Sequence, residues 1–454
     1  MFDALKKIIG KAKVDYADIR YEIKKETIIS FNGRELTQVG TNSTDGYVVR
    51  VLNKGGLSTA SFTDAAIAEK ALKITVENAN IIGAARKNPV KMAKTEVITD
   101  TFIPVLDEDP RKIPLEEKVE LTRKYNNIPL QNDKVITTSI AYREVCREKY
   151  FVTSEDSKIR EDLITTQLGG AIVAKDGNLI QNVRVGVGGS NGFLNVRDKE
   201  SHFETQTATV LELLKSKPVK GGVYNCILNP NLAGVFTHEA FGHFSEADII
   251  ETIPSMREKM KIGSKLGSDI LNIVDDATIP NQLGFYKYDD EGVKVRKTQL
   301  IKNGVLSGRL HSRRTSAEFN EPVSGHSVAE DYRYAPIIRM GNIFIEPGKY
   351  SLDELFGVLG DGLYLLDAKG GQTAGENFTF GAQYGYIVKG GEKSEMVRDI
   401  NISGNLYKTL KDISAIGSGI VFDKTGGCGK GQMNIRSSYG GSNIIINNLV
   451  VGGV

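Results

Sequence analysis

Cysteine is scarce in this chain of 454 residues. The three cysteines, Cys146, Cys226 and Cys428, are odd in number and scattered over the whole length. Disulfide frameworks use paired cysteines in short secreted chains, so a fold held together by disulfides is excluded. Cys428 is flanked by glycines, and in a reducing compartment it is of more interest as a thiolate ligand or as a nucleophile.

Long apolar runs and a net charge are also lacking. No stretch of about 18 apolar residues predicts a membrane span, and the start, MFDALKKIIGKAK, lacks the apolar core and cleavage site of a secretory signal. Lys and Arg (58) nearly balance Asp and Glu (56), so no net field draws the chain onto nucleic acid or an anionic membrane. We therefore expect a cytoplasmic protein that binds neither nucleic acid nor membrane.

The first half of the chain predicts strands followed by helices. Between Tyr16 and Thr63 apolar and polar residues alternate in period two, the pattern of half-buried antiparallel strands. Asp64 then caps a helix whose sheet-facing side we assign to Ile67, Ala71 and Ile74. Four of the twelve prolines fall between residues 89 and 114, which predicts a connector near 83–114 without a regular element. A helix from about 115 to 125, a β-meander over 134–187 and a helix over 201–214 follow.

A break in this pattern predicts a domain boundary at residue 218. The segment KSKPVKGG, at 215–222, combines a proline, lysines and a glycine pair. A strand over 223–228, a helix opened by Asn229 and Pro230, and many strands and turns come after it. The predicted fold class is α+β, with a sandwich-like α/β domain (1–218) and a β-rich carboxy-terminal domain (219–454) that carries the helix after Asn229.

That helix contains THEAFGHFSEAD, with two of the five histidines of the chain. A His-Glu-x-x-x-His segment predicts a metal site in which His238 and His243 are ligands and Glu239 is the general base of a peptidase. Ligands four residues apart share one side of a helix, whereas five residues separate them by about 140°. We therefore predict a π-type turn or local unwinding at 240–243, permitted by the backbone freedom of Gly242.

A catalytic zinc ion needs a third protein ligand and an open position for water. Glu246 and Asp248 lie close in sequence, and Cys428, in the loop TGGCGKGQ, offers a soft thiolate. The residues alone leave this choice open. They also leave open which group stabilises the oxyanion, for which there are three candidates: His311, His326 and Tyr332.

Several segments together resemble the TldD/PmbA family, specifically its metal-bearing TldD side. They are HEAFGHFSEAD (238–248), DDEG (289–292), LIKNGVLSGRL (300–310), APIIRMGN (335–342) and GGCGKGQ (426–432). The resemblance implies a cytoplasmic metallopeptidase with one Zn²⁺ per active subunit, in which His238, His243 and Cys428 bind the ion and Glu239 is catalytic. It thus raises Cys428 above Glu246 as third ligand. It also implies a homodimer, or a heterodimer with a PmbA-like (TldE-like) paralogue, that admits unfolded peptides.

Two other functions compete with a zinc peptidase. Members of the family have been described as modulators of DNA gyrase, and a regulatory interaction protein of that kind would need no metal. A hydrolase with Cys428 as nucleophile and a histidine as base is the second alternative. The intact set of His238, Glu239, His243 and Cys428 favours the metallopeptidase, in which Glu239 takes a proton from a metal-activated water and passes it to the leaving amine.

Overall fold

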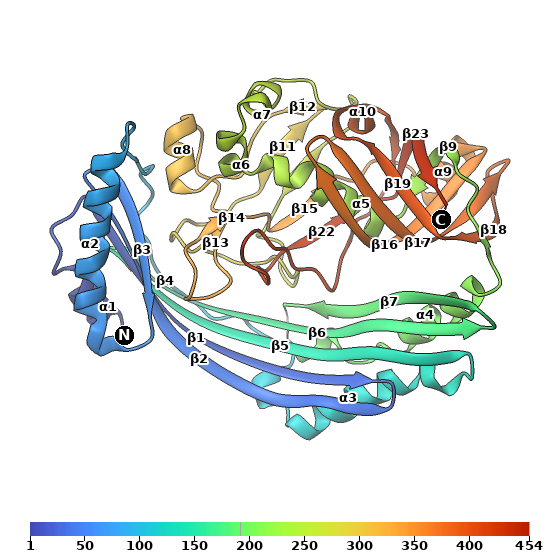
Figure 1. Ribbon diagram of the computed structural model, residues 1–454, viewed down its shortest axis with the longest axis horizontal. Coiled ribbons are helices and arrows are strands. Elements are labelled where there is room, and N and C mark those ends of the chain that lie inside the picture. The colour runs from blue at the N-terminus through green and yellow to red at the C-terminus, as the bar shows by residue number, and fades with distance from the viewer. Residues whose placement is uncertain (191, 454) are drawn as a thin grey trace.

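A computed structural model of the protein describes residues 1–190 and 192–453. Its amino-terminal part is built on a long curved sheet, which forms the lower half of the molecule in Figure 1. The strands are β1 (Tyr16–Asn32), β2 (Glu35–Asn53), β3 (Gly56–Phe62), β4 (Thr99–Phe102), β5 (Val135–Thr153), β6 (Lys158–Asp176) and β7 (Leu179–Gly189). Their spatial order is β3-β2-β1-β5-β6-β4, and β7 also pairs with β6. Neighbours run antiparallel except β4, which is parallel to β6.

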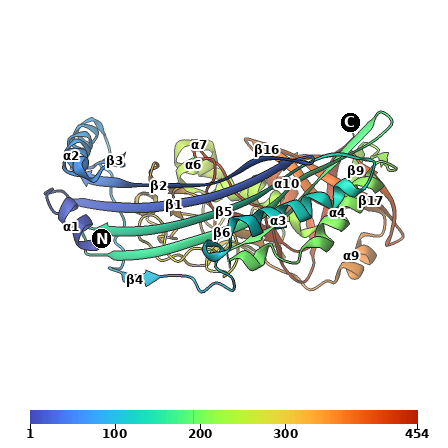
Figure 2. The same cartoon turned by 90° about the horizontal axis from the view of Figure 1, so that it is seen from below.

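Helices cover the convex face of this sheet, at opposite ends (Figures 1 and 2). They are α1 (Phe2–Ile9) and α2 (Ala68–Ala85) at one end, and α3 (Leu115–Asn127) and α4 (Glu200–Leu213) at the other. The alternation of β1 explains the arrangement. Ile19 packs into the cluster under α1 and α2, and Ile29, ten residues on and therefore on the same face, packs into the cluster under α3 and α4.

The opposite, concave face of β1 carries charged side chains that are almost fully buried. Arg20 and Glu22 are examples, with exposures of 1% and 0%. The carboxy-terminal part of the chain covers them: the Asp290 carboxylate lies 3.1 Å from the Arg20 guanidinium and 3.2 Å from the Lys149 ammonium. Arg147, on β5, donates to both oxygens of Glu22 within the sheet at 2.8 Å, and to the Ala329 carbonyl oxygen of the carboxy-terminal part at 3.1 Å. Paired charges therefore hold the two parts of the molecule together.

Two sheets and several short helices make up the carboxy-terminal part. The larger sheet contains β8 (Lys217–Pro218), β9 (Gly222–Leu228), β16 (Gly362–Ala374), β17 (Asn377–Lys389), β18 (Glu392–Arg398), β19 (Ile400–Asn405), β20 (Ile413–Ile416) and β23 (Ile444–Gly452). The other contains β10 (Ile273–Asp275), β11 (Thr298–Lys302), β12 (Val305–Leu306), β15 (Asn342–Ile345), β21 (Val421–Phe422) and β22 (Ser438–Gly441). A separate pair is formed by β13 (Ser327–Val328) and β14 (Ile337–Ile338).

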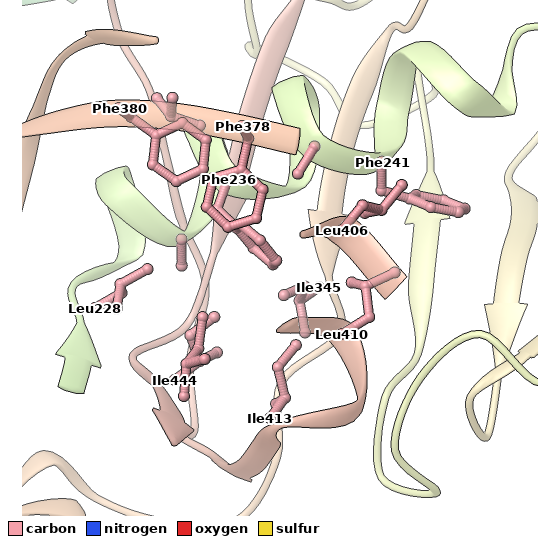
Figure 3. Packing of buried hydrophobic residues seen from close by; sticks show 14 of the residues in the cluster. Leu228, Phe236, Phe241, Ile345, Phe378, Phe380, Leu406, Leu410, Ile413 and Ile444 are labelled. Atoms are coloured by element: carbon pink, nitrogen blue, oxygen red, sulfur yellow. The ribbon is translucent and has the colours of Figure 1, made fainter. Parts of the chain in front are cut away.

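The helices of this part are α5 (Pro230–Phe236), α6 (Ala247–Thr252), α7 (Pro254–Lys259), α8 (Arg313–Phe319), α9 (Leu352–Leu359) and α10 (Leu406–Lys411). Helix α5 is the central one, because it contacts β16 of one sheet and β22 and β15 of the other. Figure 3 shows the core around it, where Phe236 packs beside Phe378 and Phe380. The main apolar cluster draws on residues between Val219 and Val451.

The predicted α+β fold class is confirmed, and so are the strands before Thr63 and the helices at α3 and α4. Two expectations about the amino-terminal part are wrong. The connector near 83–114 holds a regular element, the strand β4, because its backbone pairs with β6. Helix α2 turns Ile67 and Ile74 to solvent, with exposures of 45% and 42%, and its buried side consists of Ala68, Leu72, Thr75 and Ala79.

The close approach of α2 to the sheet explains this face. A Cβ atom at Gly56 of β3 would lie 1.9 Å from the carbonyl oxygen of Ala79 and 2.4 Å from the nitrogen of Gly83. Only small residues, such as Ala79 and Gly83, fit at the point of closest approach. The boundary at residue 218 stays a proposal, supported by the separate core that begins at Val219; Val454, the last residue of the proposed domain, lies outside the described residues. Within the described ranges, no helix combines the length and apolarity needed to span a membrane.

Candidate metal centre

The His-Glu segment lies directly after α5, where the helix changes its winding. The Asn229 side chain accepts a hydrogen bond from the Leu232 backbone N–H, and Pro230 occupies the first turn, so the helix begins as the sequence predicts. It continues as a π-helical turn over Thr237–Phe241 and a 3₁₀ turn over Gly242–Ser245. The predicted distortion at 240–243 is confirmed.

The π-turn sorts two pairs of side chains onto opposite sides. Phe236 and Phe241 are five residues apart and both are fully buried in the main core. His238 and His243 are also five residues apart, and their ring centroids lie 5.1 Å from each other with the planes at 90°. A wider turn brings residues i and i+5 onto one side, so the apolar pair anchors the turn while the histidine pair converges.

Gly242 has a different role from the one its backbone freedom predicts. Its φ of −55° and ψ of −46° are those of an ordinary right-handed helix, which any residue adopts. A Cβ atom at this position, however, would lie 2.2 Å from the Met340 sulfur and 3.0 Å from Ile343 Cδ1. Glycine is therefore required by space, because the turn packs directly on the start of β15.

Cys428 comes to the histidine pair from a sequence position 190 residues away. Its backbone exchanges two hydrogen bonds of 3.2 Å with Ile435, which closes the glycine-rich loop into a narrow bridge. The Cys428 sulfur lies 2.9 Å from His238 Nε2. One ligand atom from each of His238, His243 and Cys428 lies within 4.8 Å of the others.

These donors fit a zinc ion. Two imidazole nitrogens and a thiolate sulfur form a common zinc ligand set, and bonds of about 2.0–2.3 Å need donors gathered on this scale. His238 is 3% exposed, and its Nδ1 has no hydrogen-bond partner within the described part of the chain. A buried polar atom without a partner is expensive unless function retains it. Three protein donors leave one tetrahedral position open.

The electrostatics of the two histidines differ. Burial, with the charges of His243 and Arg339, holds the pKa of His238 well below its usual range, so this ring is neutral, the form that binds metals. For His243 burial acts against the charged form, but hydrogen bonds to Cys428, Glu239 and Glu246 raise its pKa to about 11. Anionic groups that draw a proton onto one ring also attract a metal cation to it.

Glu239 is placed beside the cluster and open to solvent. Its Oε2 lies 3.5 Å from His243 Nε2, and its side chain is 29% exposed. The backbone carbonyl of Glu239 accepts a 2.9 Å hydrogen bond from the Thr373 hydroxyl, which ties the π-turn to β16. A carboxylate that borders the ligands yet reaches water has the position required of a general base.

Glu246 and Asp248 do not join the three donors. Glu246 is fully buried and already bound: Arg339 Nη1 donates to one oxygen at 2.9 Å, and Lys430 Nζ to the other at 2.6 Å. Asp248 accepts from Lys430 at 2.9 Å. Hydrogen bonding to His243 and the charges of Arg339 and Lys430 outweigh burial and lower the pKa of Glu246.

The three oxyanion candidates lie in other environments. His311 is 1% exposed, with Nε2 2.9 Å from Glu321 and Nδ1 3.1 Å from Thr315. His326 is fully buried, with Nε2 2.9 Å from Asp275. Tyr332 packs over Gly46 of β2, where an added Cβ would lie 2.4 Å from the ring. All three side chains support the fold.

Arg339 and Tyr439 are residues of the site to which sequence reasoning assigned no role. Arg339 follows β14, and its Nη2 donates to the Cys428 sulfur. The Tyr439 ring, on β22, lies 5.6 Å from the His238 ring. The segment APIIRMGN contains Arg339, but nothing in its pattern distinguishes that residue from a surface arginine.

Tyr439 also lines a cavity of about 670 Å³. Its walls come from the concave face of β6 and β7, from the start of α5, and from the segment after β21. Pockets of about 300–1,000 Å³ hold drug-sized ligands. This cavity therefore has room for a short stretch of extended chain next to the metal cluster.

Two imidazoles and a carboxylate of a distorted helix meet a thiol from a distant loop in a group that could hold a metal ion. Comparison with known proteins gives the class of protein. Models of the PmbA/TldA metallopeptidase family match domain 1 at residues 17–80, the central domain at 108–215 and the carboxy-terminal domain at 221–453. The chain belongs to this family and is a metallopeptidase.

Two relatives match along nearly their whole length. A metalloprotease of Synechocystis sp. is 34% identical over 99% of this chain and 97% of its own. A zinc metalloprotease TldD homolog of Saccharolobus solfataricus is 32% identical over 98% of this chain and 99% of its own. The crystal structure of TldE from Thermococcus kodakarensis has a TM-score of 0.80 at 19% identity, and the match covers 99% of this chain and 100% of that one. A Thermotoga maritima protein described as a modulator of DNA gyrase also reaches 0.80, at 20% identity and 99% of both chains.

Proposed function

We propose that this protein is a zinc-dependent peptidase that cleaves unfolded peptides or small proteins. The convergence of His238, His243 and Cys428 beside Glu239 carries the proposal. The zinc assignment rests on the chemistry of the two nitrogen donors and one sulfur donor. A relative from Saccharolobus solfataricus that matches nearly the whole chain is named a zinc metalloprotease.

The reaction divides among residues of the chain. His238, His243 and Cys428 would hold the ion, which when bound supplies the Lewis acidity that makes water a good nucleophile near neutral pH. Glu239 accepts the proton of the attacking water and then delivers it to the amine nitrogen as the peptide bond breaks. Thr373 fixes the Glu239 backbone through its hydrogen bond to the carbonyl oxygen.

Substrate binding is supported by an open strand edge beside the π-turn. Within the described residues, β16 pairs with β9 only through Leu363–Leu365. Its later part, with Gly370 and Gly371 exposed, runs towards Thr373, which is bonded to Glu239. A free edge accepts an extended peptide through backbone hydrogen bonds with little side-chain preference. This favours unfolded chains over folded domains as substrates.

We also propose that the active unit is a dimer in the cytoplasm. The partner is a second copy or a PmbA-like paralogue, and the high structural similarity to a TldE protein supports a partner of this fold. Each metal-bearing subunit would hold one ion. We propose neither nucleic acid nor a membrane as a partner.

Replacement of Glu239 by Gln tests the proposed function. Gln has nearly the same shape but cannot accept the proton, so the variant should keep about one zinc per subunit and lose peptide cleavage by several orders of magnitude, about 10³ or more. Metal content and cleavage of an unfolded peptide are measured side by side. Glu258→Gln, on the exposed surface of α7, is the matched control and should cleave normally. Full activity of Glu239→Gln would rule out the mechanism.

A regulatory role without catalysis is the alternative, suggested by the Thermotoga maritima protein described as a gyrase modulator. The same variant distinguishes the two. An effect on gyrase supercoiling that persists unchanged in Glu239→Gln and in zinc-free protein would favour regulation, whereas cleavage that depends on both would favour the peptidase.

A further inference from the structure

Arg339 is one of the largest fully buried side chains of the molecule. Its guanidinium makes contacts with two elements that lie far apart in sequence. Nη2 donates to the Cys428 sulfur, and Nη1 donates to Glu246 Oε1 at 2.9 Å and lies 3.5 Å from His243 Nδ1. One planar cation thus touches the cysteine loop and the end of the histidine turn at the same time.

Lys430 completes this arrangement from the cysteine loop itself. Its ammonium group donates to the second oxygen of Glu246 at 2.6 Å and to Asp248 at 2.9 Å. Lys430 is two residues after Cys428, and Glu246 is three residues after His243. The Cys428 loop is therefore tied to the histidine turn twice, by Arg339 and by Lys430, with Glu246 as the common anion.

We propose that Arg339 is a positioning residue of the metal centre: it binds the Cys428 sulfur and, through Glu246, fixes that sulfur relative to His243. This role rests on the proposed zinc function. A guanidinium presents its N–H groups in a rigid planar fork, so two acceptors bound to one fork keep a set separation. Partners that orient ligands in this way typically contribute 10- to 100-fold, roughly, to metal affinity.

The partners of Arg339 differ from those of comparable buried arginines. Arg20 and Arg313 are similarly large and buried, but the hydrogen-bond and ion-pair partners of their guanidinium groups are carboxylates and backbone carbonyls, and Arg313 also lies over the Tyr16 ring. Arg339 uses one nitrogen for sulfur, and its Nε has no partner among the residues that the structure describes. Within the described ranges, the buried Arg20 also has a nitrogen without a hydrogen-bond partner, so the contact with sulfur is the feature that sets Arg339 apart.

The test is a zinc affinity series on the full chain. Arg339→Met removes the charge and the fork, Arg339→Lys keeps the charge, Lys430→Met removes the second tie, and Arg313→Met is the control for loss of a buried arginine. The apparent zinc dissociation constant is measured by competition with a chelator. Loading with cobalt gives a metal–thiolate absorption band. If Arg339 were merely structural, its replacement would leave this band unchanged.

Arg339→Met should raise the zinc dissociation constant about 10- to 100-fold and weaken the cobalt–thiolate band. Arg339→Lys should restore part of both, Lys430→Met should act in the same direction by a smaller factor, and Arg313→Met should bind zinc normally. If Arg339→Met does not fold, Lys430→Met, at a partly exposed position, decides the matter. Wild-type affinity and an intact band in these variants would overturn the role of Arg339 alone. Absence of zinc binding from the wild type would overturn the proposed function as well.

Discussion

The metal centre and the charged interface between the two parts of the chain are both buried and polar, yet they are organised differently. At the interface Asp290 lies within about 3 Å of two cations, Arg20 and Lys149, and Arg147 binds Glu22 through two hydrogen bonds. At the metal centre His238, His243 and Cys428 bring lone-pair donors together around one point.

This difference separates a structural charge cluster from a functional one. Opposite charges that compensate each other leave little unsatisfied, and a buried pair of this kind is expensive to break but adds little beyond the fold itself. Converging donors are unfavourable by themselves, and they become favourable when a cation is bound. His238 Nε2, which lies 2.9 Å from the Cys428 sulfur, belongs to the second situation.

Breaking the donor set should have the largest effect, and Cys428→Ser is the cleanest way to do it. Ser keeps the size of the side chain but replaces the soft ligand, so zinc affinity should fall by more than about 100-fold, beyond the usual effect of residues outside the ligand set. Thermal unfolding with and without zinc provides the measurement. Wild type should gain about 4 kcal/mol when free zinc is about 1,000 times Kd.

The Cys428→Ser variant should lose most of that gain while its metal-free stability stays close to that of wild type. Cys146→Ser, on β5, is the control and should keep the full zinc effect. Equal zinc stabilisation of Cys428→Ser and wild type would remove Cys428 from the ligand set and reopen the question of the third ligand.

Breaking the charged interface should have the opposite effect to Cys428→Ser: it should lower the stability of the fold and leave the zinc affinity unchanged. Asp290→Ala leaves Arg20 and Lys149 without their shared anion, which should lower the free energy of unfolding by about 3–5 kcal/mol. Zinc affinity at a temperature where the variant is folded should not change. Denaturant unfolding measures the free energy of unfolding, and chelator competition measures the zinc affinity. Asp269→Ala removes an exposed carboxylate and should change stability by less than about 0.5 kcal/mol.

The charged interface should also make the stability of the protein sensitive to acid, although this effect is smaller. Burial would raise the pKa of Asp331, but hydrogen bonds from Arg333 and the charge of Lys24 lower it to about 2. The unfolded value is about 3.9, so the folded state gains stability above pH 4, and this gain disappears as the pH falls from about 4 to about 2. The loss should be about 2 kcal/mol after allowance for the half-exposed Arg333.

The free energies of unfolding of wild type and Asp331→Asn, measured at intervals of roughly one pH unit between pH 2 and pH 6, check this expectation. The variant should lack the part of the acid destabilisation that comes from Asp331, and the two curves should converge at the acid end. Parallel curves over the whole range would show that Asp331 contributes nothing to the interface at low pH.

Local sequence signals predicted individual elements well and their packing poorly. The Asn229 cap and Pro230 begin α5 where expected, because these preferences depend on neighbouring backbone groups. The predicted buried face of α2 was wrong. Gly56 brings the sheet so close to the helix that only small residues fit there, and Ile67 and Ile74 face solvent instead. The strand β4 was missed because its pairing partner, β6, begins more than fifty residues later.

At the candidate metal centre, the sequence by itself predicted the types of ligand and determined the need for a distorted turn. The five-residue spacing of His238 and His243 conflicts with a regular helix, and this conflict can be recognised from helix geometry alone. The tertiary structure decided which of several candidates complete the site. It brings Cys428 to His238, binds Glu246 to Arg339 and Lys430, and keeps His311 and His326 in the core. Such contacts depend on how distant segments pack, which no local pattern of residues encodes.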